Sequence, residues 1–128
     1  MACGNYNYGT LPKGTFRIIQ GDTFQRTLSV RLRGGDKLEC IKNIYFTCDR
    51  LNISMSLPIK VDSKGIEMKG YYTLLLPATE TAKFDQCSTT YDITIDFGVV
   101  GQDVVVKTLR YQYPLEVLPK TNEVYQLK

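Results

Sequence analysis

The sequence contains no histidine and no tryptophan. Without histidine, nucleophile pairs of the Ser-His-Asp and Cys-His types are excluded, together with the commonest general base. Only chemistry based on carboxylate, lysine or tyrosine groups remains open. Without a core tryptophan and a paired set of core cysteines, an antibody-type immunoglobulin domain is excluded as well.

Cysteine is scarce and scattered, at positions 3, 40, 48 and 87, with no C-x-x-C pair. Zinc sites usually draw their ligands in close pairs, often together with histidine. A disulfide framework requires an oxidising compartment, and the start MACGNYNYGT has neither the charged leader nor the apolar stretch of a signal peptide. We therefore expect buried or unreactive thiols rather than a metal site, a redox pair or a disulfide. We expect no cofactor.

The sequence also lacks a strong excess of either charge, because 16 basic and 13 acidic residues leave a net charge of only +3. Nucleic-acid modules usually concentrate basic residues on one face, so this balance argues against a polyanion partner. No long apolar run could span a membrane, and Ala2 occupies the position that myristoylation requires to be glycine. A length of 128 residues fits one domain, which we expect to be made in a cytosol.

A period of two in the apolar residues is the dominant pattern from Phe16 onward, and this period predicts β-strands. The register of the pattern shifts by one residue after Asp49-Arg50, which predicts a turn or bulge near residues 49–52. Arg26 and Lys107 fall on apolar positions, so we expect a sheet edge or bulge at Arg26 and a bulge at Lys107. Pro114 predicts a free strand edge, because proline cannot donate to a ladder. The alternating apolar positions are Phe16 and Ile18; Phe24, Leu28, Val30 and Leu32; Ile44, Phe46 and Cys48; Leu51 to Leu57; Tyr72, Leu74 and Leu76; Tyr91 to Val99; and Leu109 to Val117.

Residues 77–84, PATETAKF, form the only helix-like stretch, long enough for one or two turns between two strands. Seven or eight short strands with frequent turns predict an all-β fold, an immunoglobulin-like antiparallel β-sandwich with one short helical turn. Tyr91 is placed to make a tyrosine-corner hydrogen bond. The expected organisation is a flexible N-terminal arm over residues 1–14, the domain over 15–119 and a C-terminal tail over 120–128.

Two turns interrupt the first strands, at Gly21-Asp22-Thr23 and at Gly34-Gly35-Asp36. The first lacks the spaced glycines, lysine and following helix of a phosphate loop, so we interpret it as a structural bend. Asp92 and Asp96 share a strand face about 13 Å apart, farther than the roughly 9.5 Å limit for paired glycosidase carboxylates. We interpret these two as solvated carboxylates, with a calcium or catalytic role as the alternative.

Arg31 and Arg33, with Lys37 nearby, form a small basic stripe that is typical of a solvated sheet face. Nucleic-acid or polyanion binding is the alternative for this stripe. Tyr6 and Tyr8 in the N-terminal arm are candidate partner contacts, because tyrosine is favoured at interfaces and the arm can order on a partner by strand addition. Tyr111 and Tyr113 are expected in the core.

The order of motifs resembles the immunoglobulin-like N-terminal domain of phage baseplate upper proteins and related small tail proteins, over roughly residues 15–119. The motifs that carry the resemblance are FRIIQGDTFQRTLSVRLRGG, IKNIYFTCDR, GYYTLLLPATETAKF, YDITIDF and LRYQYPLEVLPKTN. It implies a virion structural module without catalytic residues, in which Gly21, Asp22, Thr23 and Thr81 are structural. Baseplate upper proteins continue into stalks, whereas this chain stops about ten residues later, so we expect a stand-alone tail or baseplate accessory protein.

The sequence therefore predicts a non-enzymatic phage or prophage module that binds other tail or baseplate proteins, as a homo-oligomer in assembly, without nucleic-acid binding or membrane insertion. Its expected location is the virion, after assembly in the bacterial cytoplasm. The alternative is a carbohydrate- or host-surface-binding module, which an exposed platform of Tyr45, Tyr71 or Tyr72 would favour. An enzyme would require a pocket that joins Asp or Glu to Lys or Tyr.

Overall fold

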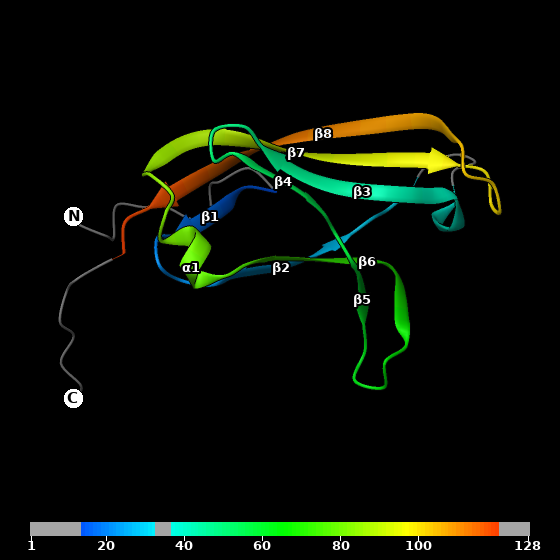
Figure 1. Ribbon diagram of the computed structural model, residues 1–128, viewed down its shortest axis with the longest axis horizontal. Helices are drawn as coiled ribbons and strands as arrows, with labels where there is room; N and C mark the ends of the chain where they lie inside the picture. The colour runs from blue at the N-terminus through cyan, green and yellow to red at the C-terminus, as the bar shows by residue number, and fades with distance from the viewer. Residues whose placement is uncertain (1–13, 33–36, 121–128) are drawn as a thin grey trace.

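The computed structural model describes residues 14–32 and 37–120, and these residues form two β-sheets. The elements in chain order are β1 Phe16–Ile19, β2 Phe24–Ser29, the 3-10 helix η3 Leu38–Cys40, β3 Ile41–Cys48, β4 Ile53–Ser56, β5 Ile59–Val61, β6 Glu67–Leu76, α1 Ala78–Thr81, β7 Cys87–Gly98 and β8 Val105–Leu118. The larger sheet has the strand order β1-β8-β7-β3-β4, and the smaller sheet has the order β2-β6-β5 (Figure 1). The all-β prediction is confirmed.

Residues from both sheets form a single hydrophobic core. In β7 every second side chain, from Tyr91 through Ile93 and Ile95 to Phe97, is buried, as the period-two pattern predicts. Ile18 of β1, Phe46 of β3 and Leu74 of β6 are 0% exposed. Because the larger and the smaller sheet both contribute to this core, each sheet turns one apolar face toward it.

Two connections between strands follow the predictions for residues 49–52 and 77–84. The turn between Cys48 and Ile53 explains the shift in apolar register, and Asn52 adopts a left-handed φ of 56° within it. The helix-like stretch forms a single turn, α1, which connects β6 of the smaller sheet to β7 of the larger one (Figure 1).

The two basic residues on apolar positions lie at a bulge and on an edge strand, as the pattern predicted. Lys107 pairs with Phe97 directly before the register shift between Phe97 and Gly98, and its Nζ lies 5.4 Å from the Phe97 ring centroid. Arg26 belongs to the edge strand β2, where its guanidinium lies 4.4 Å from the Phe24 ring centroid. Both side chains therefore place a cation over an aromatic face instead of burying it.

Three features differ from the sequence-based expectation. First, β1 pairs with β8 in parallel, so the larger sheet is not wholly antiparallel. Second, η3 and β5 were not predicted, because an element of three residues is too short to show a helical or a strand periodicity. Third, β6 begins at Glu67, before the alternating positions that start at Tyr72, and Gly70 lies inside the strand with a left-handed φ of 86°.

The tyrosine-corner prediction is wrong. The Tyr91 hydroxyl donates a hydrogen bond to the carbonyl of Gly14, far away in the sequence, instead of to backbone a few residues upstream. The expectation that Tyr111 is buried is also wrong, because Tyr111 is 41% exposed, whereas Tyr113 is half-buried and packs against the core. Alternation predicts which face a residue occupies, but not whether another strand covers that face.

Candidate interaction surfaces

The Gly21-Asp22-Thr23 bend contacts the α1 turn through Thr81, whose side chain is 0% exposed. The Gly21 N–H donates to Thr81 Oγ1 over 3.1 Å, and the Thr81 hydroxyl donates to the carbonyl of Asp22 over 2.8 Å. Asp22 also lies 3.1 Å from Lys120 Nζ. The bend thus lies against the helical turn that connects the two sheets, and the polar groups of Gly21 and Asp22 named here have partners within the chain.

An apolar groove of about 830 Å³ lies between β2 and β8, and we call it the β2–β8 groove. One wall contains Leu28 of β2 and, directly after this strand, Val30 and Arg31, and the larger-sheet wall contains Ile93, Leu109 and Tyr111. Of the basic residues in the predicted stripe, Arg31 is therefore found exposed at the rim of an apolar groove. Sequence analysis missed this groove, because no local pattern indicates that two sheets diverge.

A second apolar surface covers the end of the β7–β8 hairpin. Five valines on this hairpin are each between 43% and 62% exposed, and we call them the valine end: Val99, Val100, Val104, Val105 and Val106. The sequence analysis did not predict the exposure of these valines. The sequence signal for it is the run VVGQDVVV, in which only Asp103 is charged.

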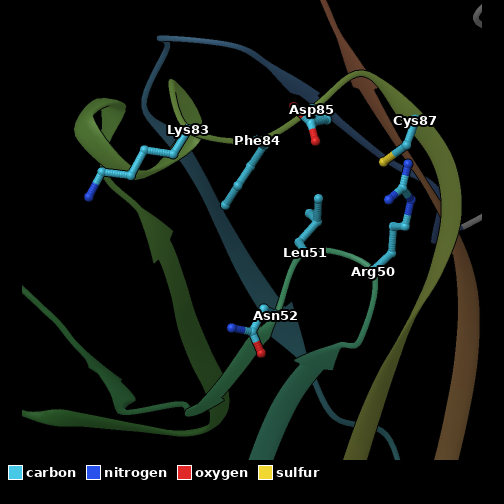
Figure 2. A pocket seen from close by; sticks show the side chains of 7 residues that line it. All are labelled: Arg50, Leu51, Asn52, Lys83, Phe84, Asp85 and Cys87. Atoms are coloured by element: carbon cyan, nitrogen blue, oxygen red, sulfur yellow. The ribbon is translucent and has the colours of Figure 1, made fainter.

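A small hollow of about 120 Å³ lies between the β3–β4 turn and the segment that precedes β7 (Figure 2). Leu51 and Phe84, which both pack against the core, lie on its walls beside Asp85. Lys83 extends away from the hollow in Figure 2, and its Nζ lies 3.7 Å from Glu80. The hollow therefore does not direct the lysine amine and the Asp85 carboxylate at a common point, and we assign it no reaction.

The outer face of the larger sheet carries Asp92 and Asp96, each with a partner on β8. Asp92 Oδ2 accepts hydrogen bonds from Arg110, at 3.0 Å from Nε, and Asp96 Oδ1 accepts one of 2.9 Å from the Thr108 hydroxyl. The other Asp92 oxygen, Oδ1, is buried without a hydrogen-bond partner. Among residues 14–32 and 37–120, no group of three or more Cys, Asp or Glu residues is arranged to hold a metal ion.

The three tyrosines proposed as a glycan platform lie on different surfaces. Tyr45 belongs to β3 of the larger sheet, and Tyr71 and Tyr72 are successive residues of β6, so they point to opposite faces of the smaller sheet. Tyr71 is 41% exposed, whereas Tyr72 packs against the core and burial raises the pKa of its hydroxyl. The structure does not bring these rings together.

The cysteines for which the structure gives positions, Cys40, Cys48 and Cys87, are free thiols. Burial raises the pKa of the Cys48 thiol, whose Sγ lies 3.4 Å from the carbonyl of Thr90. A raised pKa keeps this thiol protonated and less reactive.

Several predicted positions lie outside the described residues: Tyr6, Tyr8, Arg33, Gly34 and Gly35. In the part of the chain that is described, no helix is long and apolar enough to cross a membrane. Comparisons with protein-family models, with curated proteins and with solved structures gave no match to this chain. The class that the geometry defines is thus an all-β protein of two sheets with two exposed apolar surfaces.

Proposed function

We propose that this chain is an immunoglobulin-like β-sandwich that acts as a non-enzymatic assembly module in a phage or prophage tail or baseplate. The motif resemblance over residues 15–119 suggests the role, and the two sheets that share one core are consistent with a sandwich. In this proposal the partners are other tail or baseplate proteins and further copies of the chain. Assembly takes place in the bacterial cytoplasm, and the mature location is the virion.

The observation that carries the proposal is the valine end. Single exposed apolar residues are ordinary, but several exposed apolar residues within one short segment are typical of a surface that another protein covers. Five exposed valines on one hairpin form such a group. The mechanism is therefore packing of this apolar end against a neighbouring protein, supported by strand addition at an open sheet edge.

The experiment is to isolate phage or induced prophage particles from the strain that encodes the chain and to label them with an antibody against it. Negative-stain imaging should show the label at the tail or baseplate, and mass spectrometry of the same particles should detect the chain in a fixed ratio to known tail proteins. Absence of the chain from every particle would overturn the proposal. A glycan array on the purified protein should show no binding.

A further inference from the structure

The β2–β8 groove is bordered by two sheet edges that are open over most of their length. β1 pairs with β8 only from Leu115 to Leu118, so within residues 14–32 and 37–120 the stretch of β8 from Val105 to Pro114 has a ladder partner on one side only, in β7. β2 likewise pairs, in this part of the chain, with β6 alone. An open edge presents unpaired N–H and C=O groups that bind extended segments.

The floor of this groove is apolar but incompletely covered. Tyr111 lies in register with the core positions Tyr113 and Leu115, yet 41% of it is exposed. Leu28, Val30 and Leu109 around it are only half-buried. A core face left in this state is expected to gain stability from an apolar segment that covers it.

The first described residue of the chain, Gly14, is itself part of the groove lining. The Tyr91 hydroxyl donates to its carbonyl, and the Tyr113 ring packs so closely on it that a Cβ there would lie 2.6 Å from Tyr113 Cδ1. Gly14 also has a φ of 91°, which allows the chain to bend at this point. The described part of the chain therefore begins at the groove.

The length and chemistry of those residues fit the space. In extended form, thirteen residues reach about 43 Å, whereas the open stretch of β8 from Val105 to Tyr113 spans about 30 Å. Residues 2–12, ACGNYNYGTLP, carry no charged side chain and include Tyr6, Tyr8 and Leu11. A segment tethered at the groove also has an effective concentration near the millimolar range, which a separate molecule rarely reaches.

We propose that the groove is the docking site of the chain's own N-terminal segment, and that residues 5–12 lie along it in extended form with Tyr6 and Tyr8 against the apolar floor. In this arrangement the two tyrosines complete the core of their own domain instead of binding a partner. The inference is independent of the proposed assembly role, because it concerns the isolated chain.

Nuclear Overhauser contacts in the 128-residue chain test this directly, since its mass of 14.6 kDa suits solution NMR. The expected result is contacts from the Tyr6 and Tyr8 ring protons to methyl groups of Leu28, Val30 or Leu109. A sample that mixes labelled and unlabelled chains should show none of these contacts in an isotope-filtered experiment. No ring-to-groove contact in the first sample, or contacts between chains in the second, would overturn the proposal.

A double variant of the 128-residue chain, Tyr6→Ser with Tyr8→Ser, provides a second test. Both substitutions lie outside the described residues, so the sequence of the two sheets is unchanged. Its urea midpoint should fall below that of the parent chain, and the amides of β8 between Val105 and Tyr113 should exchange with solvent at least tenfold faster. The matched control is Tyr71→Ser, which removes an exposed tyrosine from the outer face of β6. Equal midpoints and exchange rates for the double variant and the parent would contradict the docking.

Discussion

At the scale of single residues, Thr81 has an unusual position, since it is a polar side chain that is fully buried. Its hydroxyl group accepts from the Gly21 N–H and donates to the Asp22 carbonyl, and it also lies 3.2 Å from the carbonyl of Ala78. One oxygen atom thereby joins the β1–β2 bend to the helical turn between the sheets. A buried N–H that loses its acceptor bears the full cost of desolvation.

Thr81→Val should therefore destabilise the protein by about 1–3 kcal/mol, because it leaves the Gly21 N–H and the Asp22 carbonyl unpaired while preserving side-chain shape. Thr81→Ser, which keeps the hydroxyl, should lose clearly less. Urea unfolding at neutral pH measures both. Thr79→Val on the exposed side of the same turn is the control, and equal losses at positions 79 and 81 would show that the hydrogen bonds contribute nothing.

Tyr91 is a second buried residue whose side-chain oxygen forms a hydrogen bond within the protein. Its ring stacks on Phe16 at a centroid distance of 4.3 Å, and its hydroxyl donates to Gly14. Burial, reinforced by Tyr113 nearby, raises the pKa of this hydroxyl above its ordinary value of 10.0. The folded state thus holds the proton more tightly than the unfolded state, and the contribution of Tyr91 to stability is complete below pH 10 and is lost as pH rises above it.

Tyr91→Phe should accordingly be less stable than the parent at pH 8, by about 0.5–1.5 kcal/mol for the lost hydrogen bond. Above pH 10 the parent loses up to about 1.4 kcal/mol per pH unit through this group, and the variant does not. The difference in unfolding free energy should therefore narrow and then change sign. Tyr71→Phe controls for loss of an exposed hydroxyl, and a difference for Tyr91→Phe that stays constant from pH 8 to 11 would refute this role of the proton.

At the scale of elements, the β7–β8 hairpin positions the valine end through a bulge. The register shifts between Phe97 and Gly98, and a Cβ at Gly98 would lie 2.1 Å from the carbonyl oxygen of Val104 and 2.7 Å from Lys42 Cε. The backbone of the opposing strand thus approaches closer than any side chain would allow. Glycine is required here by this close approach.

Gly98→Ala should destabilise the protein by about 1–3 kcal/mol, because the opposing backbone has to move. Adding Lys42→Ala tests which contact matters, since it removes the Lys42 side-chain contact but leaves the Val104 carbonyl in place. In thermal unfolding, the double variant should lose as much stability relative to Lys42→Ala as Gly98→Ala loses relative to the parent chain. Full recovery of stability would show that the lysine, and not the backbone, limits the site.

For the individual elements, the sequence predicts features that depend on the alternation of neighbouring residues. It does not predict features that depend on contacts between strands far apart in the chain. The buried positions of β7, the Cys48–Ile53 turn and the one-turn helix follow from neighbouring residues. The parallel pairing of β1 with β8 and the Tyr91–Gly14 hydrogen bond join segments far apart in the chain, and no local pattern encodes them. The exposure of Tyr111 was mispredicted for the same reason, since β1 pairs with β8 only from Leu115 onward and does not reach Tyr111.

At the scale of the whole molecule, the two exposed apolar surfaces have different proposed roles. The β2–β8 groove lies beside the point where the N-terminal segment joins the domain, whereas the valine end lies at the tip of a hairpin. The polar outer face of the larger sheet, with its Asp92–Arg110 pair, is suited to solvent. The assembly role therefore rests on the hairpin and not on the groove.

Charged substitutions at the valine end should abolish incorporation into particles without loss of the fold. Val100→Glu combined with Val106→Glu places two carboxylates on the surface that packs against a neighbour, where burying an unpaired charge costs several kcal/mol. Circular dichroism should remain that of the parent, while the variant should be missing from purified particles in a complementation experiment. Val61→Glu, at a valine on β5 that is 53% exposed, should still be incorporated.

The most direct measurement of the central claim is a cryo-electron microscopy map of the tail or baseplate from the phage that encodes this chain. The account predicts density for the two-sheet domain in that assembly, with the β7–β8 hairpin buried against a neighbouring protein. A complete map in which the domain is absent, or in which it is present with Val99, Val100 and Val104–Val106 facing solvent, would contradict it.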